Sequence, residues 1–388
     1  MGRRKAFGLM ALTVAIALSA GLLAGCSGGS TANKATSEAP KENLIIAVAG
    51  PLTGSCAQDG NDIKKGTMLA AEHINAKGGI GGRKIELVFE DDASDPKQAA
   101  SIANKLSKDP KVLAVIGHYN SSCTLAGAPI YNKAGVVEIS PGSSSPAVTT
   151  AGPYTFRVIT TDAFQGEYLA KWMVKDEGLK KIAILYENDD YGVGLQEVVT
   201  KKVKEFGGEV VAVESYYLGE TKDFSPYITK LRALKPDGLF IAGLYNEAAL
   251  IAKQAAAVGW KVPMFGVDAL YSAELITLGG SAVEGLRLSG FFHPSNPDPM
   301  VQKFVEDWKA KYGKLGGTYA AYGYDALLIV AEAIEKGGAT REGIKNYLTN
   351  MKGFKGLTGI TSFDENGDCI KEPMKLIVKD GQFQIYSK

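Results

Sequence analysis

Short apolar runs alternate with segments of helical periodicity along the chain from Leu44 onward. The first run, from Leu44 to Ala49, is continuously apolar, as expected for a strand that is covered on both faces. Helices are predicted over 62–76 and over 95–108, where Pro96 suits the first helical position. Further strands are predicted over 84–89, 112–116, 136–139, 181–185, 209–213, 238–242 and 263–267. This alternation predicts parallel sheets that are flanked by helices.

The order of elements repeats in kind, with one set of strands before about Thr160 and a second set from Ile182 onward. A chain of 388 residues with 45% apolar residues is long enough for two domains, each with its own core. We therefore expect two lobes of the same α/β architecture. Because open α/β sheets bind ligands beyond the carboxyl ends of their strands, the loops at those ends are the candidate sites.

The N-terminal segment has the pattern of an export signal. A basic start at 3–5 precedes an apolar run over 6–23, which is short for a membrane span and has no basic flank on its far side. The tetrapeptide LAGC at 23–26 resembles the bacterial lipobox, in which the cysteine is acylated. We predict a signal peptide over 1–25 and, over 26–43, the lipidated Cys26 with a flexible tether. The protein would be exported and held by lipid at the outer face of the cell membrane or in the periplasm.

The charge balance and the cysteine content exclude several classes of protein. Subtracting the three basic residues of the signal from 43 Lys and Arg leaves 40, against 42 Asp and Glu. Such a balance gives no reason to expect nucleic acid as a partner. Besides Cys26 there are only Cys56, Cys123 and Cys369, which resemble neither a disulfide framework nor a metal site.

Motifs of nucleotide-binding and catalytic α/β proteins are missing from the sequence. No G-x-G-x-x-G follows the first predicted strand, no glycine-rich loop ends in Gly-Lys-Ser/Thr, and no G-x-S-x-G elbow occurs. The three histidines, His73, His118 and His293, are far apart, which leaves little for acid–base or metal chemistry. We expect a protein that is not an enzyme and that needs no cofactor.

Two hydroxyl-rich loops follow neighbouring predicted strands. They are GHYNSSCT at 117–124 and SPGSSSP at 140–146, and each leads into a predicted helix or turn. Free N–H groups at a helix start bind an anion, and serine hydroxyls add donors, so the loops suit a carboxylate. Ordinary helix capping by serine remains an equal alternative. Asp268 follows another strand and could receive an ammonium group, although acidic residues at such positions are more often helix caps.

Four stretches resemble the Leu/Ile/Val-binding proteins of ABC importers, which have the type I periplasmic binding fold. They are AVAGPLTGSCAQDG at 47–60, INAKGGIGGRKIELVFEDDASDPKQAA at 74–100, residues 115–150, and FDENGD at 363–368. The likeness extends over nearly all of 44–388. It implies two three-layer α/β lobes with parallel sheets, joined by three hinge crossovers. Lobe 1 would take 44–161 plus 291–374, and lobe 2 would take 162–290 plus 375–388.

The resemblance also implies roles for single residues. The ligand's carboxylate would be held by Ser121, by Ser144 and by a backbone contact at Gly142, and the ammonium-binding position of the family falls on Asp268. The remaining wall of the pocket would be formed by Asp59, Tyr119, Asn120, Ser143, Tyr191, Tyr319, and Leu244 or, with a shift of one residue, Tyr245.

Two departures from the family pattern bear on specificity and on disulfides. Asp59 stands where the family has an aromatic side chain that covers the apolar group of the ligand. The family's disulfide is missing because its partners correspond to Ser94 and Asn120. A different bridge between Cys56 and Cys123, predicted in two loops at the edge of the cleft, stays open.

The environment of Asp59 limits what the pocket can bind. Burying a Leu, Ile or Val side chain yields about 1.5–3 kcal/mol, and desolvating a carboxylate without a partner would cost more than that. Asp59 must therefore point to water, bond the protein, or meet a polar part of the ligand. The third case would favour a polar or cationic amino acid.

The resemblance implies an exported binding protein that closes its lobes around a small amino acid, aliphatic or branched-chain, and delivers it to the permease subunits of an ABC importer. Two alternatives stay open: a binding protein for a polar or other amino acid, and a sensor that presents its ligand state to a receptor. We expect a monomer that contacts the membrane through its lipid anchor only.

Anchoring can be tested by removing the thiol that would carry the lipid. If Cys26 is acylated, Cys26→Ala should move the protein from the membrane fraction of its host to the soluble fraction, because a single acylated residue is the only expected membrane contact. Immunoblots of fractionated cells measure this shift. An unchanged partition would contradict lipidation.

Overall fold

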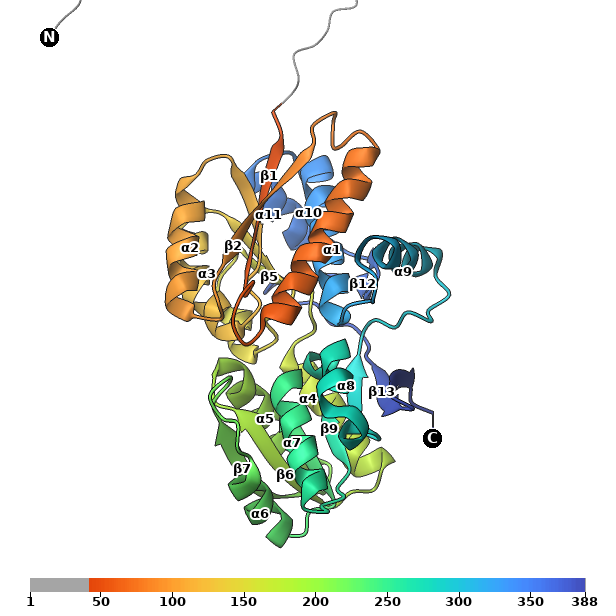
Figure 1. The fold of residues 1–388 in the computed structure, drawn as a ribbon. Helices are drawn as coiled ribbons and strands as arrows, with labels where there is room; N and C mark the ends of the chain where they lie inside the picture. Colours follow the sequence, from red (N-terminus) through yellow and green to blue (C-terminus); the bar gives the residue numbers. More distant parts are fainter. Residues whose placement is uncertain (1–41, 388) are drawn as a thin grey trace, which may run out of the picture. The chain divides into compact units, whose positions relative to one another are not determined.

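The computed structural model describes residues 42–387, and the predicted signal peptide, Cys26 and most of the tether lie outside these residues. The described chain forms two large β-sheets, each with helices on both faces, and one two-stranded hairpin (Figure 1). This arrangement confirms the predicted α/β fold with two three-layer lobes. Within 42–387, every helix is too short or too polar to span a lipid bilayer.

The first sheet has five parallel strands. In spatial order they are β2 (Ile85–Asp91), β1 (Leu44–Gly50), β3 (Val112–Ile116), β4 (Val137–Ser140) and β5 (Thr155–Arg157). Helices α2 (Pro96–Lys108) and α3 (Ser121–Ala134) pack together on one face. Helices α1 (Ala57–Ala76), α10 (Thr318–Gly337) and α11 (Arg341–Asn350) cover the other face (Figure 1). The apolar run that begins at Leu44 is thus a buried strand, as predicted.

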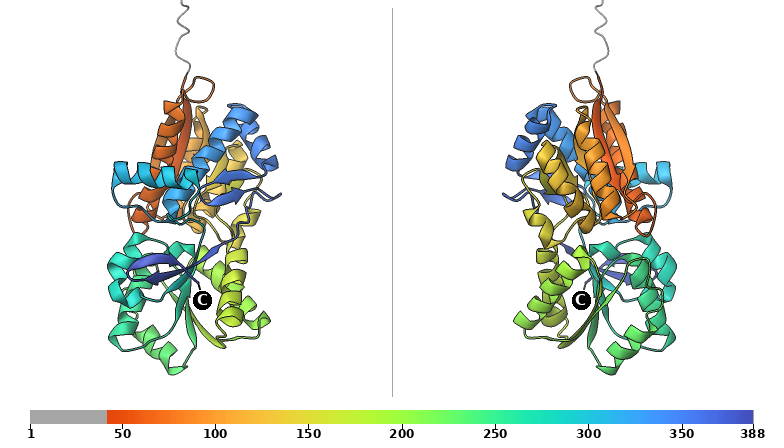
Figure 2. Two further views of the ribbon diagram at one scale, coloured as in Figure 1. Left: turned by 90° about the vertical axis from the view of Figure 1, so that its right-hand side faces the viewer. Right: turned by 90° about the vertical axis from the view of Figure 1, so that its left-hand side faces the viewer.

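The second sheet has seven strands, of which only β13 runs antiparallel to the rest. In spatial order they are β14 (Gln382–Ile385), β13 (Met374–Lys379), β10 (Arg287–Gly290), β9 (Met264–Gly266), β8 (Gly238–Ala242), β6 (Lys181–Glu187) and β7 (Glu209–Tyr216). Strands β10 to β7 are parallel, whereas β13 and β14 form an antiparallel edge that the sequence patterns did not predict. The last strands of the chain therefore complete the second sheet, as the dark-blue segment in Figure 2 shows.

Helices also cover both faces of the second sheet. They are α4 (Asp162–Lys171), α5 (Asp190–Glu205), α6 (Ser225–Ala233), α7 (Tyr245–Ala257) and α8 (Ala273–Gly279). Helix α4 packs on α5, and α7 packs on α6 and α8. Helix α9 (Pro299–Tyr312) precedes α10 in the chain. The hairpin of β11 (Phe354–Gly356) and β12 (Gly359–Thr361) follows α11.

The chain passes between the two sheets at three places. These crossovers lie between β5 and α4, between β10 and α9, and between β12 and β13. The first crossover connects Arg157 at the end of β5 with Asp162 at the start of α4. The limits of the two lobes given above stay a prediction.

Helix α1 begins at Ala57, earlier than the predicted 62, because tertiary packing overrides the weak helical propensity of its first turn. Gly60 lies so close to the chain before the helix that a Cβ there would be 1.9 Å from the carbonyl oxygen of Pro51. Cys56 lies in the turn just before α1, as predicted, whereas Cys123 lies inside α3 rather than in a loop. Both are free thiols in the structure, which does not contain the bridge left open above.

Candidate functional site: a cavity between the two sheets

A narrow cavity lies where the carboxyl ends of the two sheets meet. It is lined from the first sheet by Tyr119, Asn120, Ser121, Gly142 and Ser144, from the second by Tyr191, Leu244 and Ala269, and from α10 by Tyr319. All of these except Ala269 are residues that the sequence analysis predicted for the site.

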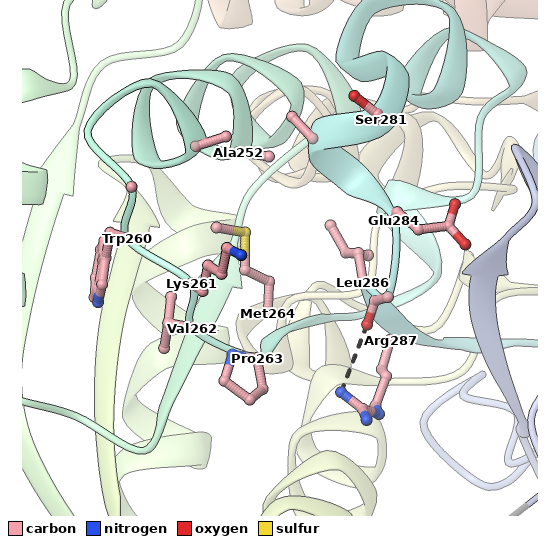
Figure 3. A pocket seen from close by; sticks show the side chains of 14 residues that line it. Ala252, Trp260, Lys261, Val262, Pro263, Met264, Ser281, Glu284, Leu286 and Arg287 are labelled. Carbon is pink, nitrogen blue, oxygen red and sulfur yellow. Dashed lines mark hydrogen bonds between the residues drawn. The ribbon is translucent and has the colours of Figure 1, made fainter.

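A wider hollow of about 1,080 Å³ lies elsewhere on the second lobe (Figure 3). It is lined by residues around the starts of β9 and β10, among them Met264 and Arg287. The only hydrogen bond drawn among its lining residues joins Arg287 to the carbonyl of Gly285, at 3.5 Å. Because ligands of parallel sheets bind at the carboxyl ends of the strands, the smaller cavity is the candidate site.

Hydrogen bonds to one backbone carbonyl hold the two hydroxyl-rich loops together. The hydroxyl of Ser140 donates to the carbonyl oxygen of His118 at 2.6 Å, and that of Ser143 donates to the same oxygen at 3.2 Å. At Gly142 a Cβ would lie 2.5 Å from the Tyr119 ring, so only glycine permits this approach. The loops after β3 and β4 are thereby fixed against each other at the carboxyl ends of the strands of the first sheet.

The two predicted carboxylate-binding serines both line the cavity. Ser121 is the first residue of α3, and its Oγ accepts a hydrogen bond from the backbone N–H of Ser145 at 3.3 Å. Ser144 Oγ donates to Oδ2 of Asp162 at 2.9 Å. Asn120, which precedes α3, makes no side-chain cap, and its Oδ1 is buried without a partner. The hydroxyls of Ser121 and Ser144 and the uncapped start of α3 therefore line the cavity.

The structure places three predicted wall residues behind the lining rather than on it. Ser143 bonds to Thr124 Oγ1 at 2.7 Å and to backbone carbonyls of the loop. Tyr245 is the first residue of α7, so its neighbour Leu244 is the one that faces the cavity. Asp59 lies in the first turn of α1 and is fully buried.

Asp59 bonds the protein, which is the second of the three environments considered for it. Its Oδ2 accepts a hydrogen bond of 2.7 Å from the hydroxyl of Tyr119, and its Oδ1 has no partner. Burial raises the pKa of the Asp59 carboxyl well above its usual range, although the Tyr119 hydroxyl opposes this. The Tyr119 ring in turn packs edge-on against Tyr319, with ring centres 4.8 Å apart. Asp59 thus holds part of an aromatic wall in place.

Asp268 lies beside the cavity, at the start of a short 3₁₀ turn (Asp268–Leu270) that follows β9. It is 1% exposed. Its Oδ1 accepts from Gln165 Nε2 and its Oδ2 from the hydroxyl of Tyr322, both at 3.1 Å. Burial raises the pKa of Asp268 to about 6, and the two donors limit this rise. Asp268 is therefore mainly ionised at neutral pH, with a fixed orientation.

Asp162 was not predicted from the sequence, yet it contacts a residue of the lining. It is the first residue of α4, immediately after the first crossover, and it is fully buried. Burial raises the pKa of its carboxyl to about 8; the Ser144 hydroxyl lowers it and the charge of Asp268 adds to the rise. The only signal in the sequence is an acidic residue after Thr161, and this reads as a helix start.

Hydrogen bonds across the gap between the sheets close the cleft around the cavity. The hydroxyl of Ser145 donates to the carbonyl of Asp190 on α5 at 2.9 Å. On another side, Asn246 Nδ2 on α7 donates to the carbonyl of Ser55 at 3.0 Å. The closed state explains why Tyr119, Ser121 and the other lining side chains are almost completely buried.

Residues 44–379 match the family described as periplasmic binding proteins, and the chain belongs to this family. Such proteins bind solutes for transport systems and are exported. Three proteins of known name illustrate the likeness. The leucine-, isoleucine-, valine-, threonine- and alanine-binding protein of Pseudomonas aeruginosa is 34% identical over 84% of this chain and 87% of its own length.

Two solved structures are similar in both fold and sequence. The leucine-binding protein LivK of Thermotoga maritima is 36% identical, has a TM-score of 0.83, and is matched over 89% of this chain and 98% of its own. LivJ of Streptococcus pneumoniae, a branched-chain amino acid transporter substrate-binding protein solved with isoleucine, is 30% identical with a TM-score of 0.82, over 88% and 98% of the two chains. The resemblance that was drawn from the sequence is thereby confirmed.

Proposed function

We propose that this protein encloses a small amino acid between its two lobes, through both charged groups of the ligand's backbone, and delivers it to an ABC importer. The observation that carries the proposal is the composition of the closed cavity. Serine hydroxyls and a helix start line it on the side of the first sheet, and Asp162 and Asp268 are buried behind the lining on the side of the second. A zwitterion would place its two charges on these two sides.

The ligand's carboxylate would be held by the first sheet. Ser121, Ser144 and the backbone at Gly142 line this side of the cavity. The first N–H groups of α3 have no side-chain cap, so they and the dipole of a 14-residue helix are available to an anion. These groups support the carboxylate assignment over simple helix capping.

The ammonium group would be accepted by Asp268. This carboxylate is buried, keeps a largely ionised state, and is oriented by Gln165 and Tyr322. Gln165 is itself fixed because its Oε1 accepts a hydrogen bond of 2.9 Å from Ser289. A buried carboxylate without a cationic partner is unfavourable, and an ammonium group would supply that partner.

The rest of the lining favours an apolar side chain. Leu244, Ala269 and the rings of Tyr119, Tyr191 and Tyr319 form most of the remaining wall. The names of the relatives, which include leucine, isoleucine and valine, support an aliphatic or branched-chain ligand. The buried hydroxyl of Tyr191 and Oδ1 of Asn120 lack partners, which keeps a polar amino acid as the second candidate.

The remaining parts of the proposal concern anchoring, partners and chemistry. A lipid on Cys26 would hold a monomer at the membrane, where permease subunits would receive the ligand. The protein would release its ligand unchanged, since it belongs to a family of solute-binding proteins. A sensor that presents its ligand state to a receptor would use the same closed cavity, and requires a different partner.

A thermal-shift panel of amino acids tests the proposed function. We expect leucine, isoleucine or valine to raise the melting temperature of protein that was freed of ligand by unfolding and refolding. A ligand at a hundredfold excess over its dissociation constant stabilises the folded state by about 2.7 kcal/mol. Mass spectrometry of ligand released by denaturation should recover the amino acid unchanged. Stabilisation by another class of solute, but by no amino acid, would contradict the proposal.

Asp268 is tested by removing its charge and then restoring it. Asp268→Ala should abolish measurable binding in calorimetry, because an unpaired ammonium group in the closed cleft costs about 3–5 kcal/mol. Asp268→Glu should restore much of the affinity. The control is Asp325→Asn, which changes a buried carboxylate that bonds Leu357 and Thr358 away from the cavity. Normal affinity in Asp268→Ala would remove the ammonium assignment.

A further inference from the structure

One buried carboxylate beside the cavity has an oxygen with nothing to bond. Asp162 is fully buried, and its Oδ2 accepts the hydroxyl of Ser144 at 2.9 Å. Its Oδ1 is also shielded from solvent but has no hydrogen-bond partner. Since Ser144 lines the cavity, this carboxylate lies directly behind the lining, at the hinge between the lobes. Its free oxygen is available to a donor that enters the cavity.

Among residues 42–387, Arg157 is the one cation whose charge is seen to act on this carboxyl group, and it forms no hydrogen bond with it. The titratable groups that act on Asp162 or are acted on by it are Arg157, Asp189, Asp268 and Tyr191, with Tyr319 from α10. Arg157 is committed elsewhere: its Nε bonds Asp368 Oδ1 at 2.6 Å, and its Nη1 bonds the carbonyl of Ser145 at 2.7 Å. Every other charged member of the set is an acid.

Asp162 and Asp268 are therefore two buried carboxyl groups, each of which disfavours the ionisation of the other, and Asp162 is mainly protonated at neutral pH while no cation is present. Helix α4 connects them, because Gln165, one turn after Asp162, donates to Asp268 Oδ1. Burial and the charge of Asp268 raise the pKa of Asp162 to about 8. Two carboxylates that approach each other without a cation disfavour the closed state, and a cation between them removes this penalty.

We propose that Asp162 is a second acceptor for the ligand's ammonium group, opposite Asp268, and that the cleft closes only around a ligand that brings this cation. The inference rests on the proposed function. It adds the reason why the site would select an amino acid over an acid that lacks the ammonium group. An ammonium group has three donors, enough to bond both carboxylates and one further acceptor. A deaminated analogue of the same shape would leave both carboxylates unpaired, so the site rejects it.

The alternative is that Asp162 only positions Ser144. Asp162→Asn separates the two roles because the amide oxygen still accepts the Ser144 hydroxyl while the charge is lost. The probes are L-leucine and 4-methylpentanoate, which differ only in the ammonium group. If the panel identifies another amino acid, that amino acid and its deaminated acid are used instead. Melting curves verify that each variant is folded, and Asp162→Ser is the second variant if Asn does not fold.

Isothermal titration of wild type and variant with both probes gives four dissociation constants. We expect Asp162→Asn to weaken L-leucine by about 10- to 100-fold, the range for a hydrogen bond to a charged group. Binding of 4-methylpentanoate should stay unchanged or become tighter, because this acid offers no donor to Asp162 in the wild type. Ser121→Ala, which alters the carboxylate side without touching Asp162, should weaken both probes by similar factors.

Equal weakening of both probes by Asp162→Asn would overturn the inference and leave Asp162 as a residue that positions Ser144. Unchanged L-leucine affinity would overturn it as well. These outcomes leave the proposed function intact, since L-leucine still binds the wild type. If no amino acid binds the wild type, the proposed function is contradicted, and the inference fails with it.

Discussion

Several carboxylates are buried around the cavity without a basic side chain to neutralise them, and the closed arrangement of the lobes depends on how they are satisfied. Asp59 is stabilised by a single hydroxyl, that of Tyr119, while Asp268 has two donors and Asp162 one. Burial raises the pKa of each of them. Burial disfavours the ionised form of each of these groups, and a cationic group of the ligand reverses that balance.

The first lobe supplies the opposite environment with backbone groups rather than with basic side chains. The loops after β3 and β4 are held together at the carbonyl of His118, and they direct hydroxyls and a helix start toward the cavity. Because the donors are part of the rigid sheet edge, they need little reorganisation when a carboxylate arrives. The donors for the ligand's carboxylate thus lie on loops of the first sheet, and the acceptors for its ammonium group, Asp162 and Asp268, lie in the second lobe.

Much of this arrangement could be predicted from the sequence because it depends on local patterns. The apolar run at Leu44 and Pro96 at a helix start specify β1 and α2, and serine-rich loops at strand ends indicated the carboxylate side. The resemblance added Asp268 and most of the lining, including Tyr191 and Tyr319.

What could not be predicted depends on contacts between distant residues. The hydrogen bond from Tyr119 to Asp59 joins residues 60 positions apart. In the sequence, Asp162 has only the pattern of a helix start. Its hydrogen bond with Ser144 becomes visible only in the fold. The choice between Leu244 and Tyr245 depended on where α7 begins, and a single sequence does not fix a helix boundary to one residue.

The central claim is that the cleft recognises the two charges of an amino acid with opposite lobes. A crystal structure of the protein with the amino acid identified by the thermal-shift panel tests it most directly. We expect the ligand's carboxylate oxygens within about 2.7–3.2 Å of donors on Ser121, Ser144 or α3, and its ammonium nitrogen at that distance from Asp268 and Asp162. A ligand bound in the reverse orientation, or outside this cavity, would contradict the account.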